Sequence, residues 1–214
     1  MATTLIFVRH GESEGNKSGR FNGSMDFPLS DKGRAQAIKT AEYLDKYKID
    51  TAYSSDLLRA KETAQTIAER QNVSLIEDTG LREINGGDFE GQLFDELAIK
   101  FPVEFKTWME DLANCQCPNG ESIRGLFERY NAKIKEIAKN NKDKTILIGT
   151  HAMPIRVMST LWHKKDLSAV RDVDYVKNAS VTVVDYTDID NPKILEYDIA
   201  EHLGELMTEL PKIV

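Results

Sequence analysis

Two kinds of segment alternate along the chain. Short runs of apolar residues are separated by longer stretches in which apolar residues recur at helical spacing. Two of the short runs are continuously apolar, which is typical of strands buried on both faces of a sheet. The last two runs flank a turn, and this spacing predicts a β-hairpin. The predicted strands cover residues 4–8, 51–54, 72–75, 145–149, 181–186 and 194–199.

Amphipathic helices are predicted between these strands. Ser30 is expected to cap a helix whose apolar face includes Ala37, Ile38, Ala41 and Leu44. Asp56 is expected to cap the next helix, in which apolar residues recur at helical spacing. The other helices are predicted over 123–138, over about 152–162 with Pro154 in the first turn, and over 93–112 with a break near Pro102.

Strands that alternate with helices predict a three-layer α/β/α fold with a mainly parallel sheet, to which the hairpin adds an antiparallel edge strand. No repeat or Pro/Gly/Ser-rich linker divides the chain, so we expect a single domain over 1–214. Within it we expect a cap-like insertion at about 84–122 and a loosely held tail at about 201–214. In such sheets the ligand binds beyond the carboxyl ends of the strands.

Composition restricts the classes of partner. The chain has 28 Lys and Arg against 35 Asp and Glu, a net charge of −7, which argues against a nucleic-acid partner. An anionic substrate must therefore be held by a local cluster of cations. The apolar runs are too short for a membrane span, and the first strand follows the N-terminus without a basic segment, so we expect a cytoplasmic protein. Cys115 and Cys117 lack nearby histidines, and we expect no metal site.

Reactive side chains occur where the predicted strands end. Arg9 and His10 follow the first strand, His151 follows the strand at 145–149, and Arg59 lies in the first turn of a helix after 51–54. Arginine presents forked donors that suit phosphate, and a neutral imidazole is a nucleophile toward phosphorus. The cation of Arg9 would also favour the uncharged form of His10. The sequence therefore predicts phosphoryl transfer through His10.

A leaving alkoxide needs a proton, and a partly desolvated carboxyl group can supply it. Glu83 is the best candidate, although its position alone does not distinguish it from an ordinary surface carboxylate. Asn16 offers a neutral amide donor to the phosphoryl oxygens, and His151 a further donor if it is protonated.

Five motifs in the same order resemble the histidine phosphatase superfamily, also called the phosphoglycerate mutase-like family. An Arg-His-Gly triplet alone would be weak support, but five motifs across residues 4–160 are specific. The motifs are Arg-His-Gly-Glu with a later Asn at 9–16, Gly…Asp…Pro-Leu…Gly…Gln-Ala within 21–37, the second arginine segment at 54–64, Glu…Gly…Glu-Gly at 83–91, and Pro-x-Gly-Glu-Ser at 118–122.

This resemblance implies a role for each matching residue. His10 would carry the phosphate, Glu83 would donate the proton, and the family requires neither a metal nor a cofactor. Ala152 stands where the family usually has glycine. The implied catalytic residues are His10, Glu83, His151, Arg9 and Arg59, and the implied substrate-binding residues are Arg9, Asn16, Asn22, Gly23, Arg59, His151 and Ala152.

Three functions fit such a site. We favour a phosphomonoester hydrolase acting on a small phosphorylated metabolite. The alternative is a cofactor-dependent phosphoglycerate mutase, but mutases carry a cation-rich run directly after the glutamate, and residues 84–88 contain no cation. A non-catalytic module that binds a phosphorylated ligand is a weaker alternative, because none of the implied catalytic residues is missing. The sequence leaves the leaving group and the oligomeric state open.

Overall fold

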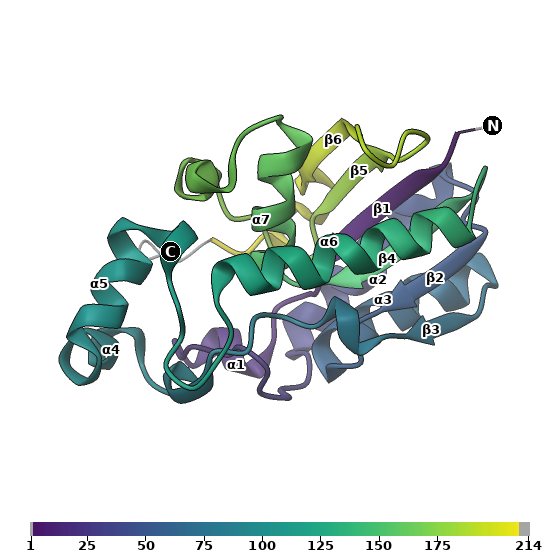
Figure 1. The fold of residues 1–214 in the computed structure, drawn as a ribbon. Coiled ribbons are helices and arrows are strands. Elements are labelled where there is room, and N and C mark those ends of the chain that lie inside the picture. The colour runs from purple at the N-terminus through teal and green to yellow at the C-terminus, as the bar shows by residue number, and fades with distance from the viewer. Residues whose placement is uncertain (1, 210–214) are drawn as a thin grey trace.

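A mixed sheet with helices on both faces forms the centre of the fold (Figure 1). The computed structural model describes residues 2–209. The strands are β1 (Thr4–Arg9), β2 (Thr51–Ser54), β3 (Leu75–Glu77), β4 (Thr145–Thr150), β5 (Val181–Asp185) and β6 (Lys193–Ile199). The α-helices are α1 (Glu14–Lys17), α2 (Asp31–Tyr43), α3 (Leu58–Gln71), α4 (Phe94–Lys100), α5 (Pro102–Glu110), α6 (Ile123–Asn140) and α7 (Ala152–Trp162).

The strand order is β3-β2-β4-β1-β5-β6. Strands β3, β2, β4 and β1 are parallel, whereas β5 runs antiparallel to β1 and β6 antiparallel to β5. The predicted fold class and closing hairpin are therefore confirmed. The extended segment predicted at 72–75 begins later, because Asn72 adopts a left-handed conformation, with φ of 54°, that ends α3.

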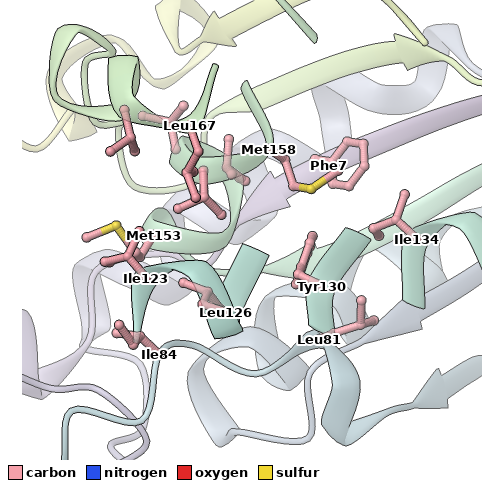
Figure 2. Packing of buried hydrophobic residues seen from close by; sticks show 14 of the residues in the cluster. Phe7, Leu81, Ile84, Ile123, Leu126, Tyr130, Ile134, Met153, Met158 and Leu167 are labelled. Carbon is pink, nitrogen blue, oxygen red and sulfur yellow. The ribbon is translucent and has the colours of Figure 1, made fainter. Parts of the chain in front are cut away.

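The central strand β1 is buried on both sides, which explains its unbroken apolar run. Leu5 and Phe7 pack against α6 and α7, and the ring of Phe7 lies 4.8 Å from that of Trp162. Figure 2 shows side chains from α6, α7 and β1 gathered in this cluster. Ile6 and Val8 point to the other face, where they pack against α2 and α3. The sheet thus fixes the direction of β1, and with it the position of the residues that follow.

Helix α2 confirms one prediction and corrects another. The Ser30 hydroxyl caps it, accepting a hydrogen bond from the Gly33 amide at 3.0 Å. Ile38, however, is 52% exposed, whereas Ala37 is fully buried. Successive helical residues differ by about 100°, so the face that buries Ala37 turns Ile38 away from the sheet. None of the helices within residues 2–209 has the length and apolar composition that crossing a membrane requires.

The predicted cap of α3 is wrong. The Asp56 carboxylate does not accept a bond from the helix; it accepts one from Nε of Arg82 at 2.7 Å. The Leu58 amide at the start of α3 instead donates to Asp26, from a distant loop, at 2.7 Å. Asp56 therefore pairs with the cation of Arg82, and Asp26 accepts the helix amide in its place.

Helices α4 and α5 lie beyond the carboxyl ends of the parallel strands (Figure 1). They meet at Phe101 and Pro102, which confirms the predicted break. Trp108 of α5 belongs to the main core cluster, and its ring lies 5.1 Å from that of Phe21. Aromatic packing thus attaches this helix pair to the loop that follows α1.

The C-terminal segment is held more firmly than predicted. Residues Glu201–Leu206 form short 3-10 turns beside α2, and Leu203 is only 3% exposed. Gln36 of α2 donates to the Leu206 carbonyl at 2.7 Å and to the Thr208 hydroxyl at 2.8 Å. The expected loose tail is therefore wrong for residues 201–209, and the rest of it lies outside the described residues.

This packing predicts a measurable contribution to stability. Leu203→Ala should lower the free energy of unfolding by about 2 kcal/mol, because it leaves a cavity beside Ala179 and Ala200. Leu195→Ala is the matched control, since Leu195 is 59% exposed and its loss should change stability by less than about 0.5 kcal/mol. Urea titration measures both. Equal stability of the two variants would contradict a packed C-terminal segment.

Candidate active site

A cavity of about 460 Å³ opens where β1 and β4 end. Eight of the predicted site residues line it, and the ring of the ninth, His151, lies 5.2 Å from the ring of His10. The lining residues among those predicted are Arg9, His10, Asn16, Asn22, Gly23, Arg59, Glu83 and Ala152. The structure therefore brings together segments from four separate parts of the chain.

The hydrogen bonds of His10 fix which ring nitrogen carries the proton. Nδ1 lies 2.7 Å from the Gly11 carbonyl, which can only accept, so Nδ1 is the protonated nitrogen. Nε2 then holds the lone pair and accepts a bond from Nε of Arg59 at 3.3 Å. Burial, and next the cations of Arg59 and Arg9, keep the pKa of His10 well below its usual range. The imidazole is therefore neutral, with its nucleophilic nitrogen toward the arginine.

Arg59, in the first turn of α3, is 1% exposed and is held by carbonyl groups. Its two terminal nitrogens donate to the carbonyls of Met25 and Gly23, each at 2.7 Å. Arg9, the last residue of β1, donates from Nη1 to the Val176 carbonyl at 2.6 Å. Burial lowers the pKa of Arg9 to about 10 and also lowers that of Arg59. Arg9 nevertheless remains cationic at neutral pH.

Several buried polar atoms near His10 lack partners within residues 2–209. They include Nε of Arg9 and both ring nitrogens of His151. Burial, followed by the charge of Arg59, holds the pKa of His151 well below its usual range, so the ring is neutral and offers one N–H rather than a cation. A buried donor without an acceptor is costly, and the oxygens of a bound phosphate would satisfy these donors.

Asn178 is a site residue that the sequence analysis missed. Its side-chain amide is 2% exposed and donates to the His10 carbonyl at 3.1 Å and to Oδ1 of Asn16 at 3.3 Å. Oδ1 of Asn16 also accepts from the Ser13 amide at 3.0 Å, so the donor Nδ2 of Asn16 is left for a ligand. The topology of the sheet could have located Asn178. This residue precedes β5, and because β5 runs antiparallel to β1, β5 begins at the edge where β1 ends.

Glu83 lies in the loop after the turn at Thr79–Leu81 and is partly buried. Its carboxylate accepts the amide of Ile84 at 2.9 Å and that of Met153 at 3.3 Å. Desolvation raises its pKa, although both hydrogen bonds and the charge of Arg59 oppose the shift. Nη2 of Arg129 donates a hydrogen bond to the backbone carbonyl of Glu83 at 3.3 Å. The carboxyl group thus faces the cavity with a greater tendency to stay protonated than a surface glutamate has.

The loop at 22–24 is positioned by a carboxylate. Glu90 accepts from the amide and the hydroxyl of Ser24, both at 2.7 Å. Gly23 has a φ of 48°, and a Cβ there would lie 2.3 Å from the Glu90 carboxylate, so only glycine fits. Ala152 is 6% exposed in the first turn of α7, where its methyl group is accommodated beside the cavity.

The described part of the chain holds no cluster of three or more His, Cys, Asp or Glu side chains arranged to bind a metal ion. Cys115 and Cys117 are buried and are not joined by a disulfide.

Comparison with known proteins agrees with this geometry. A family model described as the histidine phosphatase superfamily, branch 1, matches residues 5–199. Phosphoserine phosphatase 1 of Hydrogenobacter thermophilus is 34% identical over 210 residues, covering 98% of this chain and 99% of that protein. Phosphoglycerate mutase-like protein 4 of Arabidopsis thaliana is 33% identical over 204 residues, covering 94% of this chain and 87% of that protein.

A solved structure, the native mycobacterial glucosyl-3-phosphoglycerate phosphatase, superposes with a TM-score of 0.84 at 27% identity, covering 94% of this chain and all of that chain. The resemblance seen in the five motifs is therefore confirmed. The chain belongs to the histidine phosphatase superfamily, branch 1, and is a phosphomonoester hydrolase.

Proposed function

We propose that this hydrolase transfers the phosphoryl group of its substrate to Nε2 of His10 and then to water. The observation that carries the proposal is the fixed tautomer of His10, with Nδ1 bound to the Gly11 carbonyl and Nε2 free of a proton. Nε2 attacks phosphorus, the N–P bond forms and the P–O bond to the alcohol breaks. Arg59, Arg9, His151 and Asn16 then surround the charged oxygens of the phosphoryl group.

In this proposal Glu83 handles both protons of the cycle. The carboxylic acid first protonates the departing alkoxide, and the resulting carboxylate then takes a proton from the attacking water. As the new P–O bond forms, the N–P bond breaks and phosphate leaves. Glu83 returns to its protonated form, so the proton count balances over one turnover. Its raised pKa suits the first step, because the group must begin protonated.

The names of the relatives support a small phosphomonoester as the substrate, since they refer to phosphoserine and glucosyl-3-phosphoglycerate phosphatases. Another relative is named as phosphoglycerate mutase-like, and mutase activity was the alternative to hydrolysis in the sequence analysis. We favour hydrolysis because the segment Ile84 to Asp88, next to Glu83, places no cation at the cavity. For the compartment we retain the cytoplasm, on the sequence features alone.

The phosphohistidine predicts a trappable intermediate. Rapid quenching of the enzyme with ³²P-labelled substrate should give an acid-labile, base-stable adduct on His10. His10→Ala should abolish the adduct and lower kcat by about 10³-fold or more. His163→Ala, outside the cavity, should leave both unchanged. A fully active His10→Ala enzyme would refute the mechanism.

The role of Glu83 predicts a pH profile that depends on the leaving group. Hydrolysis of alkyl phosphates should fall as pH rises through the elevated pKa of Glu83, because the acid is then lost. The acidic limb should lie well below 6.5, because the depressed pKa of His10 keeps the nucleophile neutral.

The variant Glu83→Gln should slow hydrolysis of alkyl phosphates by about a hundredfold. It should slow p-nitrophenyl phosphate far less, since that leaving group needs little protonation. Stopped assays from pH 4 to 9 on both substrates measure the effect. Equal losses on both substrates would remove Glu83 from this role.

Asn178 should act as a positioning residue. Asn178→Ala removes one of the donors that orient the Asn16 amide and should lower kcat/KM by about tenfold, the value of one hydrogen bond. Asn178→Asp should lose more, because a carboxylate cannot donate to Asn16 and repels the phosphate. Asn114→Ala, on the surface, is the control. Thermal melting separates this effect from unfolding, and wild-type kinetics in Asn178→Ala would contradict it.

A further inference from the structure

The peptide bond between Gly11 and Glu12 adjoins the nucleophile and is hydrogen-bonded at both ends. Its carbonyl, that of Gly11, accepts the bond from Nδ1 of His10 at 2.7 Å. Its amide, that of Glu12, donates to Oε1 of Gln36 at 2.7 Å. A peptide unit is planar, so its carbonyl and its amide point in opposite directions and turn together. The bond to Gln36 therefore sets the direction of the carbonyl that His10 contacts.

The residue before this amide gives the peptide bond little restraint of its own. A Cβ on Gly11 would lie 2.5 Å from the Gly33 carbonyl oxygen in α2, so a larger residue does not fit there. Without a Cβ, the backbone of Gly11 has access to more conformations than that of any other residue type. The direction of the Gly11 carbonyl therefore depends on contacts from other segments, and Gln36 supplies the contact at the amide end.

The C-terminal segment fixes which way round the side-chain amide of Gln36 lies. Gln36 is fully buried, and its Nε2 donates to the Leu206 carbonyl at 2.7 Å and to the Thr208 hydroxyl at 2.8 Å. A carbonyl can only accept, so the nitrogen of the side-chain amide must face Leu206. The oxygen is then left for the backbone amide of Glu12. The turns at Glu201–Leu206 and the residues after them thus hold Gln36 in the orientation that the Glu12 amide requires.

We propose that Gln36 is a positioning residue for the reaction: it holds the Gly11–Glu12 peptide bond so that His10 keeps its proton on Nδ1 and presents Nε2 to phosphorus. This inference rests on the proposed function, in which Nε2 attacks. The other tautomer would place a proton on Nε2, where it would meet the Nε–H group of Arg59 and prevent attack. Gln36 does not line the cavity, so it acts through the backbone.

The variant Gln36→Met tests the proposal, because methionine has a similar length but cannot replace the amide's hydrogen bonds. Its kcat should fall about tenfold, the value of one hydrogen bond, since part of the enzyme carries the wrong tautomer and the rest is less well oriented. The loss should be equal on alkyl phosphates and p-nitrophenyl phosphate, because it arises at the nucleophile. KM should change little, because Arg9 and Arg59 keep their carbonyl partners.

The tautomer itself can be observed by ¹⁵N NMR of the His10 ring. The wild type should be protonated on Nδ1 alone, whereas Gln36→Met should show a population protonated on Nε2. A loss of stability without any effect on the nucleophile would not produce this change.

Gln71→Met is the matched control. Gln71 of α3 also joins two backbone groups: it accepts from the Ile49 amide at 3.5 Å and donates to the Leu44 carbonyl at 3.2 Å, away from the cavity lining. Its loss should lower stability without changing kcat or the tautomer of His10. Thermal melting establishes that both variants are folded under the assay conditions.

Gln36→Glu gives an independent readout and serves where Gln36→Met does not fold. When protonated, the introduced carboxyl group has an acceptor oxygen for the Glu12 amide and an O–H donor for the Leu206 carbonyl, as the native amide has. Once ionised it can no longer donate, and the contact with Leu206 is lost. Burial raises the pKa of a carboxyl group, which brings this change toward neutral pH. The kcat of Gln36→Glu relative to the wild type should therefore rise as the pH falls from 8 to 5.

A wild-type kcat and a wild-type tautomer in folded Gln36→Met would overturn the inference, as would a relative kcat of Gln36→Glu that does not change with pH. Either result would still leave the labelled adduct on His10 in the wild-type enzyme. Failure of the proposed function would instead remove that adduct and leave His10→Ala active, so the two failures can be told apart.

Discussion

The site depends on burying two guanidinium groups at a sheet edge, with no carboxylate of residues 2–209 bound to either. Such burial is expensive unless the donors are hydrogen-bonded, and here three neutral carbonyls from two loops, those of Gly23, Met25 and Val176, accept the bonds. These carbonyl groups accept bonds from both terminal nitrogens of Arg59 and from Nη1 of Arg9 without cancelling the charge of either side chain. The charge is therefore available to a phosphate, whereas an ion pair at the same place would have neutralised it.

Burial in the same low-polarity setting shifts the pKa values of His10 and Glu83 in opposite directions. Desolvation disfavours the charged form of each, so it lowers the pKa of His10 and raises that of Glu83. One group is thereby kept as a neutral base and the other as a neutral acid. The proposed nucleophile and the proposed acid can then coexist within one cavity, whereas burial would not separate the pKa values of two exposed side chains in this way.

The sequence predicted the parts of the site that a buried strand positions. Arg9 ends β1, His10 follows it and His151 follows β4, so the continuous apolar runs and the rule for parallel sheets locate them. The role of Asp56 was missed, because its partner Arg82 is distant in the chain. The packing of Leu203 was missed for the same reason: tertiary contacts override local pattern, and a short segment of turns has no periodicity to reveal them.

The directions of the two hairpin strands, β5 and β6, place the residues that flank them at the site. Because β5 is antiparallel to β1, its first residues lie at the carboxyl edge, and because β6 reverses again, the residues after it return to that edge. Asn178 and Thr208 both reach the cavity in this way. The five motifs end before either residue, so they describe the phosphate end alone. The walls around the leaving group come partly from segments placed by topology, where relatives can differ in substrate while keeping the same chemistry.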